Sequence, residues 1–186
     1  LHNCGHAWNL PNLNQSGLWI AADNVILENN LITNNFVGMV FYHSSNHIVF
    51  NNTINSNGLH GILGLNSHNN EITYNKIQYN GKLPYPIGFA GDGILLNQTS
   101  NSIITHNTIT SNSKGNGIEL IDAPNSIITN NVVKSNSYNG IYLSGALTST
   151  ITNNIVELNG YNGIYLSGGP GSIILHNLVN PNVGSR

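Results

Sequence analysis

Asparagine recurs in this chain at a spacing of about 23 residues, and this repeat constrains the fold more than any other feature. Each unit begins at an apolar residue, and only the interval between Ile72 and Ile104 is clearly longer than the others. The anchors are Leu27, Val49, Ile72, Ile104, Ile128, Ile151 and Ile174. Asparagine stands three residues after every anchor, at Asn30, Asn52, Asn75, Asn107, Asn131, Asn154 and Asn177. It stands again eight residues after, at Asn35, Asn57, Asn80, Asn112, Asn136, Asn159 and Asn182.

The composition of each unit excludes helix and predicts short strands. Asn, Gly, Ser and Thr disfavour helix, and the apolar positions alternate with a period of two. A unit of this length suits one rung of a parallel β-solenoid, in which equivalent residues of successive rungs (a column) stack about 4.8 Å apart. We expect the asparagine columns to point inward and to bond from rung to rung as amide ladders. The glycine that precedes an inward apolar residue in most units predicts a bend with positive φ or a close backbone approach.

The segments Asn153–Val156 and Asn162–Ser167 resemble a known family repeat. They look like the right-handed parallel β-helix repeat of the NosD-like, carbohydrate-binding and sugar-hydrolysis group of pectate-lyase-like solenoids. The resemblance implies an all-β, single-stranded parallel β-helix of about seven rungs, each of roughly 22–24 residues. It would occupy residues 24–186, after an irregular N-terminal segment or partial first rung at 1–23, with a loop insertion at about 81–92. The group includes polysaccharide lyases, hydrolases and epimerases, surface proteins and a periplasmic copper-maturation protein, so it implies no single activity.

Charge and cysteine content exclude several classes of function. Charged residues are 6% of the chain, against roughly 25% in ordinary domains, and the net charge is −2. Five Lys and Arg residues in all cannot form a nucleic-acid footprint. No apolar run approaches the roughly 18 residues of a membrane span. The single cysteine, Cys4, excludes an internal disulfide framework.

Three acidic residues stand at neighbouring positions of one predicted face. Alignment of the units on their glycine places Asp92, Glu119 and Asp122 on adjacent rungs. Glycoside cleavage requires paired carboxyl groups roughly 5–10 Å apart, so we consider these three as catalytic residues of a polysaccharide hydrolase or lyase. The same oxygens suit Ca²⁺. Alternatively, they are exposed acids that keep a nearly neutral protein soluble.

Aromatic and histidine side chains accompany these acids. Tyr142 and Tyr165 share an outward position on consecutive rungs and offer flat ring faces to sugars, or simply cover the sheet. His60 shares the column of Asp92, and Tyr85 lies in the insertion. We expect these four residues to contact a substrate. A lyase or epimerase acting on uronates would also need cations such as Lys82 or Lys114, and their scarcity favours neutral sugars or no chemistry.

The N-terminus carries a candidate metal site. His2, Cys4 and His6 alternate, so on a strand they would share a face suited to copper or zinc. Together with the resemblance, this leaves a copper-handling accessory protein open. Three potential ligands close together in a chain end are also often incidental.

Three functional classes therefore remain. The chain is expected to bind a polysaccharide along its outer face, with cleavage of that polysaccharide left open, at an extracellular, cell-surface or periplasmic location. It could instead be a structural or filament-forming solenoid, since rungs without a cap favour end-to-end self-association. Copper handling is the third class. Because the chain starts at Leu1 without Met and no amphipathic cap follows its last rung, we expect a processed product or a segment of a longer protein.

Overall fold

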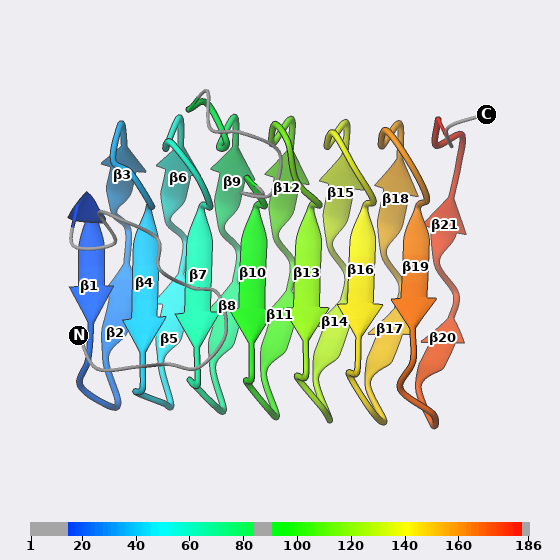
Figure 1. The fold of residues 1–186 in the computed structure, drawn as a ribbon, viewed down its shortest axis with the longest axis horizontal. Helices are drawn as coiled ribbons and strands as arrows, with labels where there is room; N and C mark the ends of the chain where they lie inside the picture. Colours follow the sequence, from blue (N-terminus) through cyan, green and yellow to red (C-terminus); the bar gives the residue numbers. More distant parts are fainter. Residues whose placement is uncertain (1–14, 84–90, 184–186) are drawn as a thin grey trace.

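A computed structural model describes residues 15–83 and 91–183, and in these ranges the chain forms a parallel β-solenoid (Figure 1). Each rung contributes one short strand to each of three sheets, and every sheet has seven strands. Neighbouring strands of each sheet are therefore three apart in the chain, as β1, β4 and β7 are. Within the described part of the chain, no helix is long and apolar enough to cross a membrane.

The strands are short because a turn follows each of them. Sheet I comprises β1 (Leu18–Ile20), β4 (Met39–Tyr42), β7 (Ile62–Leu65), β10 (Ile94–Asn97), β13 (Ile118–Ile121), β16 (Ile141–Ser144) and β19 (Ile164–Ser167). Sheet II comprises β2 (Ile26–Glu28), β5 (Ile48–Phe50), β8 (Glu71–Thr73), β11 (Ile103–Thr105), β14 (Ile127–Thr129), β17 (Thr150–Thr152) and β20 (Ile173–Leu175). Sheet III comprises β3 (Leu31–Thr33), β6 (Thr53–Asn55), β9 (Lys76–Gln78), β12 (Thr108–Thr110), β15 (Val132–Lys134), β18 (Ile155–Glu157) and β21 (Leu178–Val179).

The register of the strands confirms the columns read from the sequence. Ile72 pairs with Ile104 and Ile104 with Ile128, so the anchors stack in sheet II. The long third rung does not shift this register, because Ile62 of β7 pairs directly with Ile94 of β10. The first strand, β1, pairs with β4, so the first rung begins within the segment 1–23.

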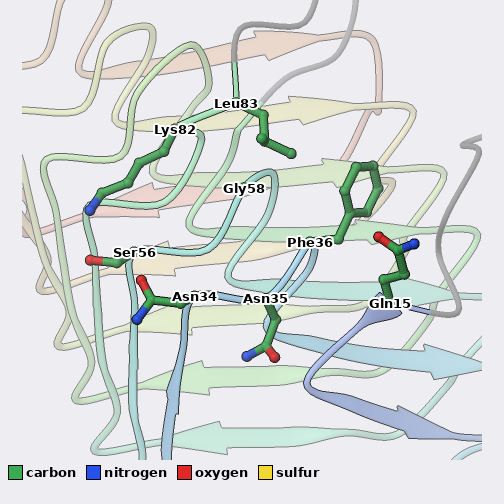
Figure 2. Close-up of a pocket in the computed structure, with 8 residues that line it drawn as sticks. All are labelled: Gln15, Asn34, Asn35, Phe36, Ser56, Gly58, Lys82 and Leu83. Atoms are coloured by element: carbon green, nitrogen blue, oxygen red, sulfur yellow. The ribbon is translucent and has the colours of Figure 1, made fainter.

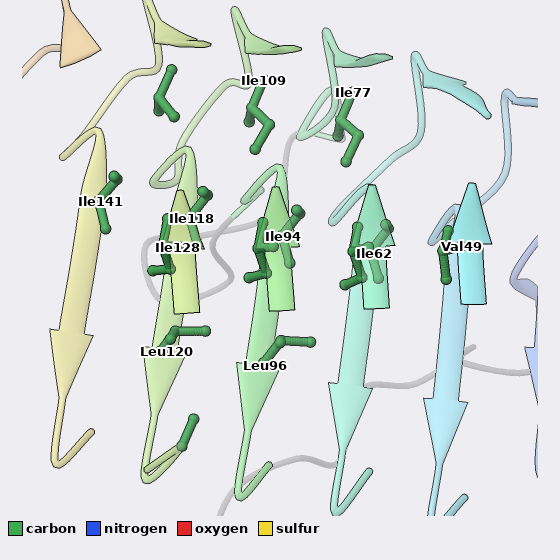
Figure 3. Close-up of a cluster of buried hydrophobic side chains, with 14 of the residues drawn as sticks. Val49, Ile62, Ile77, Ile94, Leu96, Ile109, Ile118, Leu120, Ile128 and Ile141 are labelled. Carbon is green, nitrogen blue, oxygen red and sulfur yellow. The ribbon is translucent and has the colours of Figure 1, made fainter. Parts of the chain in front are cut away.

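A single apolar core fills the space between the three sheets (Figure 3). It consists of columns of Ile, Val and Leu, and residues such as Ile62, Ile94 and Ile118 have no exposed surface. At two corners of each inner rung a buried asparagine replaces the apolar side chain. Asn107 Nδ2 lies 3.0 Å from Asn131 Oδ1, and Asn80 Nδ2 lies 2.9 Å from Asn112 Oδ1. Both predicted amide ladders are therefore confirmed.

The exposed asparagines have a second structural role. Corner residues just outside the ladder columns lie in the left-handed region, for example Asn51 at φ 52° and Asn130 at φ 54°. Asparagine tolerates this conformation better than other residues with a side chain. The high asparagine content thus has two causes, left-handed corners and buried ladders.

The glycine column resolves the two alternatives that the sequence left open. None of Gly61, Gly93 and Gly117 has positive φ, so the bend expectation is wrong for this column. A Cβ atom on Gly93 would lie 2.6 Å from the carbonyl oxygen of Gly117 on the next rung. The column requires glycine because successive backbones approach each other closely there.

The outer side of sheet I is covered over β4, β7 and β10. Val40, Leu63 and Leu95 alternate with core residues and so point outward, yet they are buried. They form a second apolar cluster, and Leu83 packs against it from the start of the insertion. The outer side becomes polar only from β13 onward, where Glu119 occupies the same column.

Candidate functional site

A third amide ladder runs along the polar part of the outer face, on the residues that precede the glycine column. Asn162 Nδ2 donates to Asn139 Oδ1 over 3.0 Å, and Asn139 Nδ2 donates to Asn116 Oδ1 over 2.9 Å. Its amides point toward the first rungs, whereas those of the two core ladders point toward the last. A ladder in this direction must end on a group that accepts hydrogen bonds.

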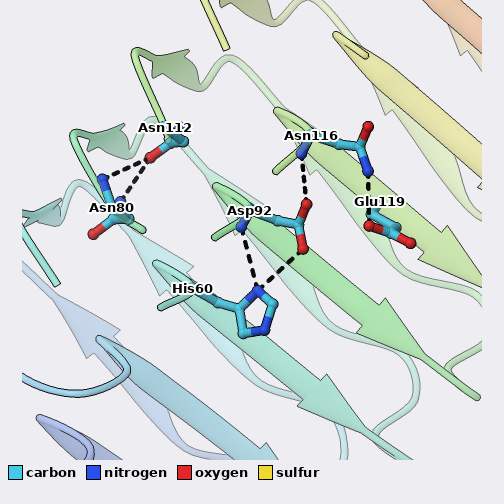
Figure 4. Close-up of polar contacts among 6 residues, drawn as sticks. All are labelled: His60, Asn80, Asp92, Asn112, Asn116 and Glu119. Atoms are coloured by element: carbon cyan, nitrogen blue, oxygen red, sulfur yellow. Dashed lines mark hydrogen bonds and ion pairs between the residues drawn. The ribbon is translucent and has the colours of Figure 1, made fainter. Parts of the chain in front are cut away.

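Two carboxyl groups terminate this surface ladder (Figure 4). The backbone N–H of Asn116 donates to Asp92 Oδ1 over 2.6 Å, and Asn116 Nδ2 donates to Glu119 Oε2 over 2.8 Å. Asp92 occupies the ladder column itself, so an acid stands where the next amide would otherwise be. The column therefore explains why this chain with few charges places two acids side by side.

The imidazole of His60 continues the column beneath Asp92. Its Nδ1 lies 3.3 Å from the Asp92 backbone N–H and 3.1 Å from Asp92 Oδ2. A ring nitrogen either accepts or donates, so Nδ1 can satisfy only one of these two Asp92 atoms. Both residues are almost completely buried, and Oδ2 has no other hydrogen-bond donor among the described residues. His60, Asp92 and Glu119 thus form one polar cluster on adjacent rungs.

Glu119 is the member of this cluster that reaches the surface. Burial and the neighbouring Asp92 carboxylate raise the pKa of Glu119 from 4.5 to about 8, although its hydrogen bond from Asn116 opposes the shift. Glu119 therefore carries a proton at neutral pH and presents a carboxylic acid beside the surface ladder.

The free energy of unfolding should depend on pH because of this proton on Glu119. Between pH 4.5 and about 8 the folded chain holds a proton that the unfolded chain has released, so the free energy of unfolding falls as pH rises through this window. We expect a loss of about 2 kcal/mol between mildly acidic and mildly alkaline pH, since partial exposure and coupling reduce the full linkage. Glu119→Gln, which mimics the protonated acid, should remove this part of the slope in urea titrations across the range. A variant with the same slope as the parent would contradict the assignment.

Four tyrosines flank the surface ladder on the last rungs. The rings of Tyr142 and Tyr165 stack with centroids 5.3 Å apart and an angle of 11° between their planes. The rings of Tyr138 and Tyr161 meet edge to face, also at 5.3 Å. The ladder residues Asn139 and Asn162 lie between these two pairs in the chain, so aromatic and amide groups alternate across the face.

Sequence reasoning missed half of this aromatic set. The signal was present, because a tyrosine stands four residues before Tyr142 and again four before Tyr165. The stacking also changes what the rings offer to a ligand. Tyr142 and Tyr165 cover one face of each other, so their edges, their hydroxyl groups and the remaining outer ring face are what they present.

The structure brings some of the predicted site residues together and separates others. Asp92, Glu119 and His60 form one cluster, but Asp92 and His60 lie beneath the surface rather than on it. Asp122 lies exposed at a corner after β13, in the left-handed conformation with φ 47°. Among the described residues, no three His, Cys, Asp or Glu side chains group closely enough to hold a metal ion, so the three acids form no calcium site there.

The remaining predicted residues lie outside the described residues. These are Tyr85 in the insertion and the candidate copper or zinc ligands His2, Cys4 and His6. Their roles stay predictions.

The repeat, the three parallel sheets and the ladders together define a protein family. The family model described as "Right handed beta helix region" matches residues 6–115 and 92–185. The chain therefore belongs to the right-handed β-helix family. No curated protein sequence matches the chain.

Solved structures with the same fold include two polysaccharide epimerases. The periplasmic alginate epimerase AlgG is similar with a TM-score of 0.69 and 18% identity over 88% of this chain. The A-module of the mannuronan C-5 epimerase AlgE4 from Azotobacter vinelandii is similar with a TM-score of 0.61 and 19% identity over 83% of this chain. The chain spans 42% of the AlgG structure and 53% of the AlgE4 module. At these identities the similarity establishes the fold.

Proposed function

We propose that this chain binds a polysaccharide along the outer face of sheet I, over β13, β16 and β19. The observation that carries the proposal is the combination of exposed tyrosine pairs with a surface amide ladder, both repeated at the spacing of the rungs. Two β-helix proteins with this fold act on alginate or mannuronan, as their names state. A repeating surface is complementary to a repeating ligand, because each rung can meet one unit of the polymer.

Each group on this face has a distinct part in binding a sugar chain. Tyr165 and Tyr161 are exposed and offer apolar ring surface together with hydroxyl groups, a combination that suits the amphipathic surface of a sugar. Asn162 is exposed at the end of the ladder. The protonated carboxyl of Glu119 can donate a hydrogen bond to a sugar hydroxyl where a carboxylate could only accept one.

The same arrangement supports catalysis as a second, narrower proposal. A general acid must hold its proton at the working pH, and the raised pKa of Glu119 meets this requirement. The buried Asp92 would then act through Glu119 rather than touch the substrate. Asp122, exposed at the corner after β13, is the candidate for the second carboxyl of a hydrolase.

Glycan binding should depend on the tyrosines of this face. In glycan-array and calorimetric titrations, the double variant Tyr142→Ala/Tyr165→Ala should lose at least about tenfold in affinity, because two aromatic contacts of about 1 kcal/mol each disappear. Tyr79→Ala is the control, since Tyr79 is also an exposed tyrosine but follows β9 on another side of the solenoid. If the parent retains no glycan, or if the control loses as much as the double variant, the proposal is wrong.

Product analysis in the same screen separates binding from cleavage. Glu119→Gln preserves a hydrogen-bond donor but cannot transfer a proton, so it should keep the affinity and abolish any chain shortening. A parent protein that binds a glycan without producing shorter or unsaturated chains is a binding module. We place the protein outside the cytoplasm, extracellular or periplasmic, where such polymers occur; the name of AlgG states a periplasmic location for that protein. Filament formation and copper handling stay predictions.

A further inference from the structure

A pocket distinct from the face of β13, β16 and β19 lies at the corner between sheets III and I, over the first three rungs (Figure 2). Its volume is about 340 Å³. This lies at the lower end of the usual range of ligand pockets, about 300–1,000 Å³, and suits a ligand of one or two sugar rings. The pocket is open to solvent and adjoins the start of the insertion in the third rung.

The first residues of the insertion are held firmly and form one wall of this pocket. The backbone N–H of Leu83 donates to the carbonyl of Gly58 over 3.0 Å, and that of Lys82 donates to the carbonyl of Asn57 over 3.4 Å. Lys114 Nζ donates to the carbonyl of Leu83 over 2.8 Å. Gly58 permits this arrangement, because any Cβ atom there would meet the side chain of Leu83. The rung with the insertion is thus attached to the rung before it, and the wall is preorganised.

Three polar side chains of the pocket make no hydrogen bond or ion pair within the described part of the chain. Asn34 and Ser56 occupy one corner column in the left-handed conformation, with φ 60° and φ 58°. Within the described residues, their side chains and the ammonium group of Lys82 make no hydrogen bond or ion pair. Figure 2 shows these three side chains on one side of the pocket, and Leu83 and Phe36 on the other. One side is therefore cationic and hydrogen-bonding, and the opposite side presents two apolar side chains, with Gln15 beside Phe36.

We propose that this pocket binds a single sugar unit that carries an anionic group, a carboxylate or a sulfate, with the anion at Lys82. The apolar side meets the C–H face of the ring, while Asn34 and Ser56 bond its hydroxyl groups. An unpaired lysine in a chain with few charges selects the anion over a neutral sugar. The ligand proposed for this pocket thus differs from the neutral sugars that the shortage of cations in the sequence favoured. The proposal for the pocket does not depend on glycan binding to the outer face over β13, β16 and β19, which carries the tyrosine pairs and is called the tyrosine face below.

Protein-observed NMR titrations with glucuronate, glucose 6-sulfate and glucose test this site. We expect both anionic sugars to shift the backbone resonances of Gly58, Lys82 and Leu83, and glucose to bind at least about fivefold more weakly. Lys82→Gln should lower the affinity for the anionic sugars about fivefold and leave that for glucose unchanged. Lys76→Gln is the matched control, because it removes the same charge from an exposed lysine of β9. Leu83→Ala should lower the affinity of the pocket for all three sugars.

The variants also separate this proposal from the one for the tyrosine face. Tyr142→Ala/Tyr165→Ala should leave binding in the pocket unchanged. A response to glucuronate alone, or to glucose 6-sulfate alone, would identify which anionic group the pocket selects and supports the proposal in either case. Equal affinities for charged and neutral sugars, equal losses in Lys82→Gln and Lys76→Gln, or no shifts at up to about 50 mM sugar would each overturn it.

Discussion

Gly140→Ala should destabilise the chain by about 4 kcal/mol, although it adds one methyl group only. The new Cβ atom would lie 2.6 Å from the carbonyl oxygen of Gly163 and 2.8 Å from Nδ2 of the ladder residue Asn159, and it would also meet the side chain of Val156. Backbone and ladder atoms cannot move aside without breaking the pairing of β16 with β19. Equilibrium urea unfolding followed by circular dichroism measures the loss.

A glycine outside this column provides the control. Gly168 has φ 76°, and a Cβ atom there would meet no atom within 4 Å. Asparagine adopts this conformation at the equivalent corner position Asn66, so Gly168→Asn should cost less than about 1 kcal/mol. Similar losses for Gly140→Ala and Gly168→Asn would show that rung spacing does not control stability.

Asn131→Ala should cost about 3 kcal/mol, because it leaves several buried groups without partners. Asn131 Oδ1 accepts hydrogen bonds from the backbone N–H and from Nδ2 of Asn107, at 2.9 and 3.0 Å. Its own Nδ2 donates to the carbonyl of Ile104 and to Asn154 Oδ1. The residue is 1% exposed, so water cannot replace these partners. The same urea titrations would measure the difference.

Asn125 is the matched exposed residue. It lies at a corner with φ 58°, a conformation that glycine adopts freely, so Asn125→Gly avoids the strain that alanine would introduce. We expect a loss below about 0.5 kcal/mol. If Asn131→Ala proved as mild as this control, the buried ladders would contribute little to stability.

The repeat made most of the fold predictable. Stacking requires equivalent residues at equivalent positions, so alignment of the units on one anchor already gives the strand register, as the pairing of Ile104 with Ile128 shows. The same alignment placed Asp92 one rung before Asn116 and Glu119 beside Tyr142. A solenoid makes these neighbours in space calculable from the chain, because each rung contacts only the next.

Burial and hydrogen-bond direction could not be predicted in the same way. Alternation showed that Leu95 and Glu119 face outward, but not that Leu95 is covered while Glu119 reaches the surface. The sequence also could not show that Asp92 ends an amide ladder whose direction opposes that of the core ladders. That direction depends on which atoms of Asn116 accept and donate, and Asn116 bonds both Asp92 and Glu119. Burial and the Asp92 carboxylate then keep the proton on Glu119, against the hydrogen bond from Asn116.

The constant register across rungs of different length has a consequence for how such chains change over generations. Each rung contributes one strand to each of the three sheets. Even the longest rung leaves the strand register of its neighbours unchanged. A gene that duplicates or deletes one unit therefore encodes a longer or shorter solenoid whose remaining contacts are unchanged. Since the rungs of β16 and β19 each carry two tyrosines and one ladder asparagine, duplication of either of these units would lengthen the outer face by one step without altering its chemistry.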